Sequence, residues 1–125
     1  MIYGLGIDLV EINRMRETIE RFGERFLERV FTKNEIGYCQ THKDKYEHLA
    51  ARFAAKEALL KAISVGWPKV SFRDVEVVNT RSGSPKIGVY GRAKDLLDKL
   101  NLQNISLTIS HTKDYATAVV IIEVE

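Results

Sequence analysis

The chain has 125 residues, of which 45% are hydrophobic and 29% charged, a composition typical of one globular domain. It has neither a basic, apolar leader nor an uncharged apolar run long enough to span a bilayer, so we expect residues 1–125 to form a single cytoplasmic domain that does not enter a membrane. The formal net charge of +2 does not by itself indicate nucleic acid binding, and the single cysteine, Cys39, excludes an internal disulfide.

The first strand is predicted from an alternating pattern over residues 2–10. Large side chains (Tyr3, Leu5, Ile7, Leu9) alternate with small or acidic ones (Gly4, Gly6, Asp8). The pattern predicts a strand that ends near a carboxylate. Asn13 is the expected N-cap of a helix over residues 14–28, and a bend is expected at Gly23.

Two more helices are predicted before the middle of the chain. Thr32 and Glu35 have the spacing of a capping box, which indicates the start of a short helix. A longer helix is expected over residues 46–63, and the break at Gly66-Trp67-Pro68 follows it.

The remaining chain predicts a hairpin, a helix and two more strands. The hairpin strands are expected over residues 71–79 and 86–91, around a turn at 82–85. A helix over 92–101 precedes strands over 104–111 and 115–125. The order β-ααα-ββ-α-ββ predicts an α+β fold with a largely antiparallel sheet.

The helix over residues 46–63 carries four charges among apolar residues, in the stretch RFAAKEALLKA. In one interpretation, Glu57 and Lys61 form an exposed pair one turn apart, while Arg52 and Lys56 extend to water. In the other, the charges face a cleft that binds a charged ligand, because a buried charge without a partner costs several kcal/mol.

Three motifs resemble those of one enzyme family. They are G-L-G-I-D-L-V-E-I, R-F-A-A-K-E-A-L-L-K-A and S-L-T-I-S-H-T-K-D-Y-A-T-A, which together span residues 4–118. In this order and spacing the chain resembles the small bacterial holo-[acyl-carrier-protein] synthases of the 4'-phosphopantetheinyl transferase superfamily. The resemblance implies Mg²⁺-dependent transfer of the 4'-phosphopantetheine arm of coenzyme A to a serine of apo acyl carrier protein, with release of 3',5'-ADP, for fatty acid biosynthesis.

The resemblance also implies a metal site. Asp8 and Glu57 match the family's metal carboxylates, and Mg²⁺ prefers oxygen ligands completed by substrate phosphates and water. Lys61 matches a lysine that contacts phosphate. Glu57, directly or through a metal-bound water, is the first choice for the general base and Glu35 the second. Lys56 is assigned either to phosphate binding or to a structural ion pair.

Further positions match the family's coenzyme A site. Ser110 and His111 are expected to bind the nucleotide phosphate end, with His111 as a hydrogen-bond donor. The other expected contacts are Arg52, Phe53 and the turn Gly83-Ser84-Pro85. Ser82 precedes this turn where many relatives carry asparagine, so the side-chain contacts of the turn are left open.

Arginines of the first predicted helix suggest a protein partner. Arg14, Arg21, Arg25 and Arg29 share one side if the helix continues through Gly23. The resemblance implies that this face docks an acidic helix of the carrier protein; the alternative is a solvated face neutralised by Glu17, Glu24 and Glu28. A noncatalytic RNA-binding domain is the competing class, but the arginines alternate with glutamates and no stacking pair of aromatics is evident.

Assembly is a further implication of the resemblance. Family members form trimers in which Asp8, Glu57 and Lys61 of one chain face Ser110 and His111 of the next. Two segments could support such packing, namely the alanine side of the helix over 46–63 and the apolar strand over 115–124. Burial within one domain explains both segments equally well.

Overall fold

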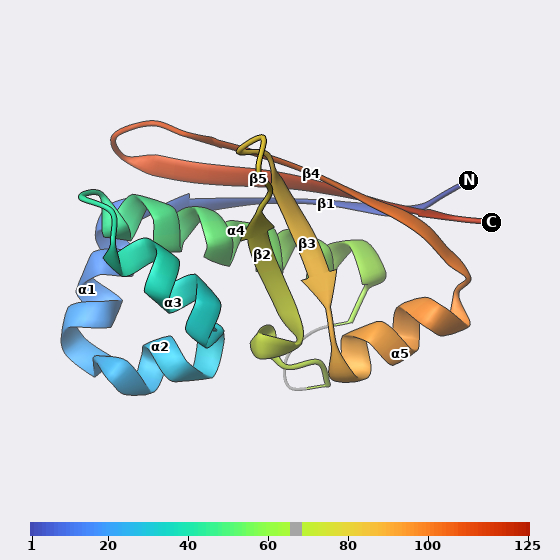
Figure 1. Cartoon of the computed structure of the whole chain (residues 1–125), viewed down its shortest axis with the longest axis horizontal. Helices are drawn as coiled ribbons and strands as arrows, with labels where there is room; N and C mark the ends of the chain where they lie inside the picture. The colour runs from blue at the N-terminus through green and yellow to red at the C-terminus, as the bar shows by residue number, and fades with distance from the viewer. Residues whose placement is uncertain (66–68) are drawn as a thin grey trace.

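The computed structural model describes residues 1–65 and 69–125, so the predicted break at residues 66–68 lies outside them. The elements, shown in Figure 1, are β1 (Ile2–Glu11), α1 (Ile12–Phe22), α2 (Glu24–Val30), α3 (Lys33–Gln40), α4 (Lys45–Ile63), the 3₁₀ turn η1 (Phe72–Asp74), β2 (Val75–Asn79), β3 (Pro85–Val89), α5 (Gly91–Lys99), β4 (Leu102–His111) and β5 (Tyr115–Val124). The α+β class and the antiparallel pairing are confirmed.

Two antiparallel sheets surround the long helix α4. The larger sheet has the order β1-β5-β4, and β2 pairs with β3 in the smaller one. In Figure 1, α4 runs along the larger sheet, α1 to α3 gather at one end of α4, and α5 lies toward the other end. In the larger sheet, Asp8 is opposite Ala118 and Ser110 is opposite Thr117.

Two glycines let β1 approach α4 closely. A Cβ atom on Gly6 would lie 2.0 Å from the carbonyl oxygen of Ala58, and one on Gly4 would lie 2.1 Å from that of Ala62. The alanine side of α4 is therefore covered by a strand of its own chain. Asp8, the next residue on this side of β1, is consequently held against the same helix.

We expect Gly6→Ala to lower the free energy of unfolding by about 1–3 kcal/mol, because the new methyl group meets helix backbone, which cannot rotate away. Urea denaturation measures the change. Gly37→Ala is the matched control, since nothing lies within 4 Å of a Cβ there. Equal stability of the two variants would contradict the close packing of β1 on α4.

The predicted helix over residues 14–28 is wrong in its start and its continuity. Strand β1 ends at Glu11 and helix α1 begins at Ile12, so the strand passes directly into the helix. The Ile12 amide donates to Asp114 O at 2.9 Å. Asn13 is not the cap; its side chain donates to Glu17 at 3.1 Å within the helix. At Gly23 the backbone has φ +62°, a conformation that ends α1, and α2 starts afresh.

Two other local predictions have opposite outcomes. The capping box of Thr32 and Glu35 at the start of α3 is confirmed. The strand predicted over residues 71–79 is wrong in its first part, because Ser71 Oγ accepts a hydrogen bond from the Arg73 amide and favours the 3₁₀ turn η1. Strand β2 therefore has only its last five residues.

The buried side chains form two clusters. One lies between α4, the larger sheet, β2 and α5, and the other joins α1, α2 and α3 to the start of α4. Cys39 belongs to the second cluster, and burial raises the pKa of its thiol to about 11, so this residue is an inert core side chain. Among the described residues, no helix is long and apolar enough to cross a membrane.

Candidate active site

A cleft opens where β1 meets α1, α2 and α4. Its volume is about 510 Å³, and its lining comprises Asp8, Leu9, Val10, Glu11, Arg14, Met15, Thr18, Phe26, Phe53, Glu57 and Tyr115. We call it the acidic cleft. Asp8 and Glu57 are far apart in the sequence and meet here because the glycines of β1 allow α4 to pack closely. Phe26 and Tyr115 were not predicted, although Phe26 follows Arg25 and Tyr115 lies inside the third motif.

Lys61 forms an ion pair with Asp8 rather than with Glu57. Its Nζ lies 2.9 Å from Asp8 Oδ1 and donates to Ile7 O at 3.1 Å. No Glu57–Lys61 pair is found within residues 1–65 and 69–125, so the exposed pair one turn apart is a wrong interpretation. The Lys61 side chain is 53% exposed, so its ammonium can also contact an anion that enters from solvent.

Glu57 and Asp8 concentrate negative charge in the acidic cleft, which favours a bound cation and favours protonation of Glu57 when no cation is bound. Burial and the Asp8 carboxylate raise the pKa of Glu57, and Lys61 acts in the opposite direction. Repulsion between the two carboxylates would be relieved by a cation. No cluster of three or more metal-binding side chains occurs in the described part of the chain, so a metal here would need phosphate or water as additional ligands.

Thr117 supports Asp8 from the neighbouring strand. Its Oγ1 donates to the backbone carbonyl of Asp8 at 2.8 Å. This contact was not predicted, although Thr117 lies inside the third motif. A β-branched residue on the central strand β5 thus helps to hold the end of β1 that carries the carboxylate.

Arg52 is buried and does not extend to water as the first interpretation supposed. Its guanidinium donates to Asn79 Oδ1 and lies 4.3 Å from the centroid of the Tyr38 ring. Its Nε is buried and has no hydrogen-bond partner among the described residues. Asn79 in turn donates to Gly83 O at 3.5 Å, so Arg52 connects α4 to the hairpin that carries Gly83 and Pro85.

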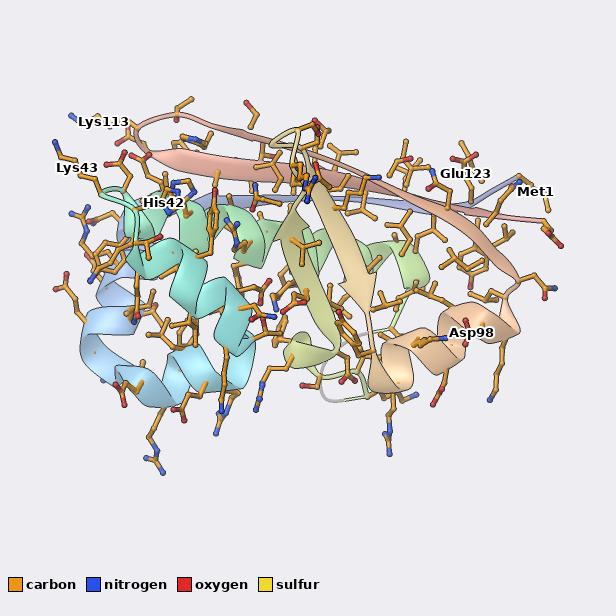
Figure 2. All side chains as sticks on the ribbon, in the orientation of Figure 1. Met1, His42, Lys43, Asp98, Lys113 and Glu123 are labelled. Carbon is orange, nitrogen blue, oxygen red and sulfur yellow. The ribbon has the colours of Figure 1, made fainter. Side chains whose placement is uncertain are left out.

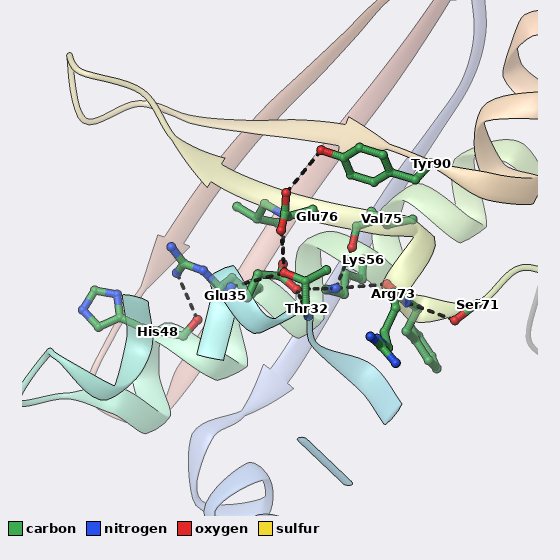
Figure 3. A network of polar contacts seen from close by, with 12 residues as sticks. Thr32, Glu35, His48, Lys56, Ser71, Arg73, Val75, Glu76 and Tyr90 are labelled. Carbon is green, nitrogen blue, oxygen red and sulfur yellow. Dashed lines mark hydrogen bonds and ion pairs between the residues drawn. The ribbon is translucent and has the colours of Figure 1, made fainter. Parts of the chain in front are cut away.

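Lys56 is also buried, and it lies in the polar network of Figure 3. Its Nζ is 2.6 Å from Glu35 Oε1, and both side chains are 0% exposed. The prediction that Lys56 extends to water is therefore wrong, and of the two roles left open the geometry supports the structural ion pair. Glu35 is not among the residues that line the acidic cleft, and both of its oxygens accept hydrogen bonds. Glu35 is therefore unsuited to act as a base there.

Ser110 and His111 lie at the end of β4, away from the acidic cleft. His111 Nδ1 is 3.7 Å from Glu47 Oε2. Glu47 precedes Glu57 by ten residues on α4, which corresponds to about 15 Å along a helix. The chain thus does not bring His111 into the cleft that holds Asp8. Figure 2 shows His42 and Lys43 at this end of the molecule, near Lys113 of the β4–β5 turn.

Two of the three arginines predicted to bind a partner line two adjoining hollows. Arg14 lines the acidic cleft, and Arg25 lines a second hollow of about 420 Å³ that shares Thr18 and Phe26 with it. Arg21 lies over the Phe22 ring at 5.2 Å. The break at Gly23 means that these residues do not follow one continuous helix. No ion pair joins them to glutamates among the residues described, so the neutralised face is not supported.

Comparison with known proteins gives a consistent result. Residues 4–120 match the family model described as "4'-phosphopantetheinyl transferase superfamily". The holo-[acyl-carrier-protein] synthase of Solibacter usitatus is 45% identical over 124 residues, which cover 98% of this chain and 99% of that protein. The synthase of Halothermothrix orenii is 42% identical over 121 residues, which cover 97% of each chain.

Solved structures agree with the sequence matches. The crystal structure of holo-[acyl-carrier-protein] synthase from Neisseria meningitidis superposes with a TM-score of 0.91 at 32% identity, covering 98% of this chain and 99% of that one. The Helicobacter pylori synthase in complex with coenzyme A gives a TM-score of 0.84 at 37% identity, covering 95% and 99%.

Proposed function

This chain belongs to the 4'-phosphopantetheinyl transferase superfamily, and from this premise we propose that it is a holo-[acyl-carrier-protein] synthase. It transfers the 4'-phosphopantetheine group of coenzyme A to a serine of apo acyl carrier protein and releases 3',5'-ADP. We assign it to fatty acid biosynthesis in the cytoplasm. The observation that carries the proposal for the site is the meeting of Asp8 and Glu57 in one cleft, with Lys61 beside them.

Asp8 and Glu57 are the proposed ligands of Mg²⁺. Their carboxylate oxygens are the ligand type that a hard cation prefers, and a cation between them would relieve their mutual repulsion. Coenzyme A phosphates and water would complete its coordination. When bound, Mg²⁺ supplies charge neutralisation at the pyrophosphate of coenzyme A and improves the leaving group.

The chain's own residues supply the remaining chemistry. The Glu57 carboxylate accepts the proton of the carrier serine, directly or through water. The partly exposed ammonium of Lys61 stabilises negative charge on the transferred phosphate. Phe53 forms an apolar wall beside these groups.

The coenzyme A nucleotide is proposed to bind between the hairpin turn and the end of β4. Gly83 has φ +87°, a backbone conformation that glycine tolerates, and Pro85 begins β3. Arg52 supports this turn through Asn79. Ser110 and His111 are exposed at the end of β4, where they are available to a phosphate.

A second copy of the chain is proposed to complete the site. On β1 the outward side chains Leu5, Ile7 and Leu9 are 63%, 60% and 65% exposed, an uncovered apolar row that favours protein association. A homotrimer with active sites between subunits would cover this row. It would also set Ser110 and His111 of one subunit against the acidic cleft of its neighbour.

The proposal is tested by incubating an apo acyl carrier protein with coenzyme A, Mg²⁺ and the enzyme. Mass spectrometry should show the gain of one phosphopantetheine group, and omission of Mg²⁺ with a chelator present should abolish it. No gain with any of a range of carrier proteins would favour a noncatalytic binding domain.

Charge reversal of Arg14, Arg21 and Arg25 to glutamate should raise the Michaelis constant for carrier protein far more than that for coenzyme A. The reason is that Arg14 and Arg25 line the two hollows, and no ion pair joins the three arginines to a carboxylate among the described residues, so an acidic helix is their expected counterpart. The dependence of the rate on salt should also weaken. Reversal of Arg92, an exposed residue on α5, is the control. Equal increases for both substrates would refute the docking face.

A further inference from the structure

Lys56 makes an unusually complete set of hydrogen bonds for a buried lysine. Its Nζ lies 2.6 Å from Glu35 Oε1 and donates to Val75 O at 2.6 Å and to Phe72 O at 2.9 Å. An ammonium group has three N–H donors, so each donor has one acceptor. Figure 3 shows the ammonium between Glu35 and the carbonyl of Val75. The side chain is fixed on every side.

The acceptors belong to three elements. Glu35 lies on α3, where its oxygens also accept the amides of Thr32 at 2.9 Å and Val77 at 2.8 Å. Phe72 lies in η1, and Val75 begins β2. Lys56 on α4 therefore connects α3, η1 and β2 at one point.

This point lies directly behind the acidic cleft. Lys56 precedes Glu57 in α4, and Phe53 is one turn earlier; both Phe53 and Glu57 line the cleft. The Phe72 ring packs on the Phe53 ring, with centroids 5.7 Å apart and an interplanar angle of 35°. The residue whose carbonyl is held by Lys56 is thus the one whose ring supports the wall of the cleft.

We propose that Lys56 is a positioning residue for the active site, which holds Phe53 through Phe72 and fixes Glu57 through the helix that both residues share. Lys56 does not touch substrate, because it is enclosed on all sides. The inference rests on the proposed function of the cleft. A lysine that only stabilised the fold would be replaceable by any change that keeps the core neutral and filled.

The double variant Glu35→Gln/Lys56→Met separates the two roles. It removes both charges together, so no unpaired charge remains, and it keeps both side-chain volumes, but it removes the ammonium that donates to the carbonyls of Phe72 and Val75. We expect the affinity for Mn²⁺ in the presence of coenzyme A, followed by EPR of free Mn²⁺, to fall about tenfold, as is usual when support of metal ligands is lost. The kcat should fall by a similar factor, and the Michaelis constant for carrier protein should change little.

The matched control is Leu97→Ala, which leaves a cavity in the core where α5 is buried, outside the acidic cleft. It should lower Tm without changing Mn²⁺ affinity or kcat. Wild-type Mn²⁺ affinity and kinetics in the double variant would overturn the proposal, and so would losses that Leu97→Ala reproduces. If the wild-type enzyme transferred no phosphopantetheine, the proposed function would be wrong, and this result is distinguishable from a failure of the Lys56 proposal.

Phe72→Leu keeps the test valid if the double variant does not fold. It preserves the carbonyl that Lys56 binds and removes the ring contact with Phe53. We expect kcat/KM for coenzyme A to fall several-fold, a loss that Leu97→Ala should not reproduce. An unchanged kcat/KM would overturn the route from Lys56 to the cleft.

Discussion

Glu57→Gln is expected to lower kcat about 10²–10³-fold, the usual effect of losing one preorganised charge at a reacting centre. Its carboxylate shares the cleft with Asp8 and is the proposed metal ligand and base. The fold should be preserved. Burial and Asp8 raise the pKa of Glu57, so its charged form is disfavoured in the folded state, and a neutral amide of the same shape removes this penalty.

Phosphopantetheine transfer at saturating substrates, over a range of Mg²⁺ concentrations, measures the loss, and a thermal melt checks the fold. Glu123→Gln is the control, because Glu123 lies on β5 at the end of the molecule opposite His42, as Figure 2 shows. Near wild-type activity of Glu57→Gln in Mg²⁺ would show that the metal assignment is wrong.

Asp8→Ala and His111→Ala proteins should each be nearly inactive alone and should regain activity when mixed. The two residues lie in different parts of one chain, and the proposed trimer brings Asp8 of one subunit to His111 of the next. After unfolding and refolding at equal ratio, about a quarter of the interfaces would join an intact metal half to an intact histidine half. Activity should therefore approach a quarter of the wild-type value.

The control for this experiment is a mixture of Asp8→Ala with Glu57→Gln. Both changes affect the same half of the site, so no interface contains an intact metal half, and refolding should restore nothing. Subunit exchange is verified by native mass spectrometry. If the Asp8→Ala and His111→Ala mixture were no more active than the average of its components, each subunit would have to build its site alone.

Much of the architecture is determined by local sequence patterns. The alternation in β1 predicted which residues share a side, because side-chain direction in a strand follows a period of two. Thr32 and Glu35 predicted the start of α3, because both hydrogen bonds of a capping box close within one turn. The family and its candidate carboxylates, Asp8 and Glu57, followed from the ordered motifs.

The partners of the charged side chains were decided only by the tertiary structure. Spacing on α4 suggested that Lys61 pairs with Glu57 and that Lys56 reaches water, whereas Lys61 pairs with Asp8 and Lys56 with Glu35. A helical pattern shows which residues share a face, but not which distant segment will cover that face. Close approach of β1 to α4 brought Asp8 within reach of Lys61, and the packing of α3 and β2 enclosed Lys56, because a buried charge must find its partner among the groups that the fold brings to it.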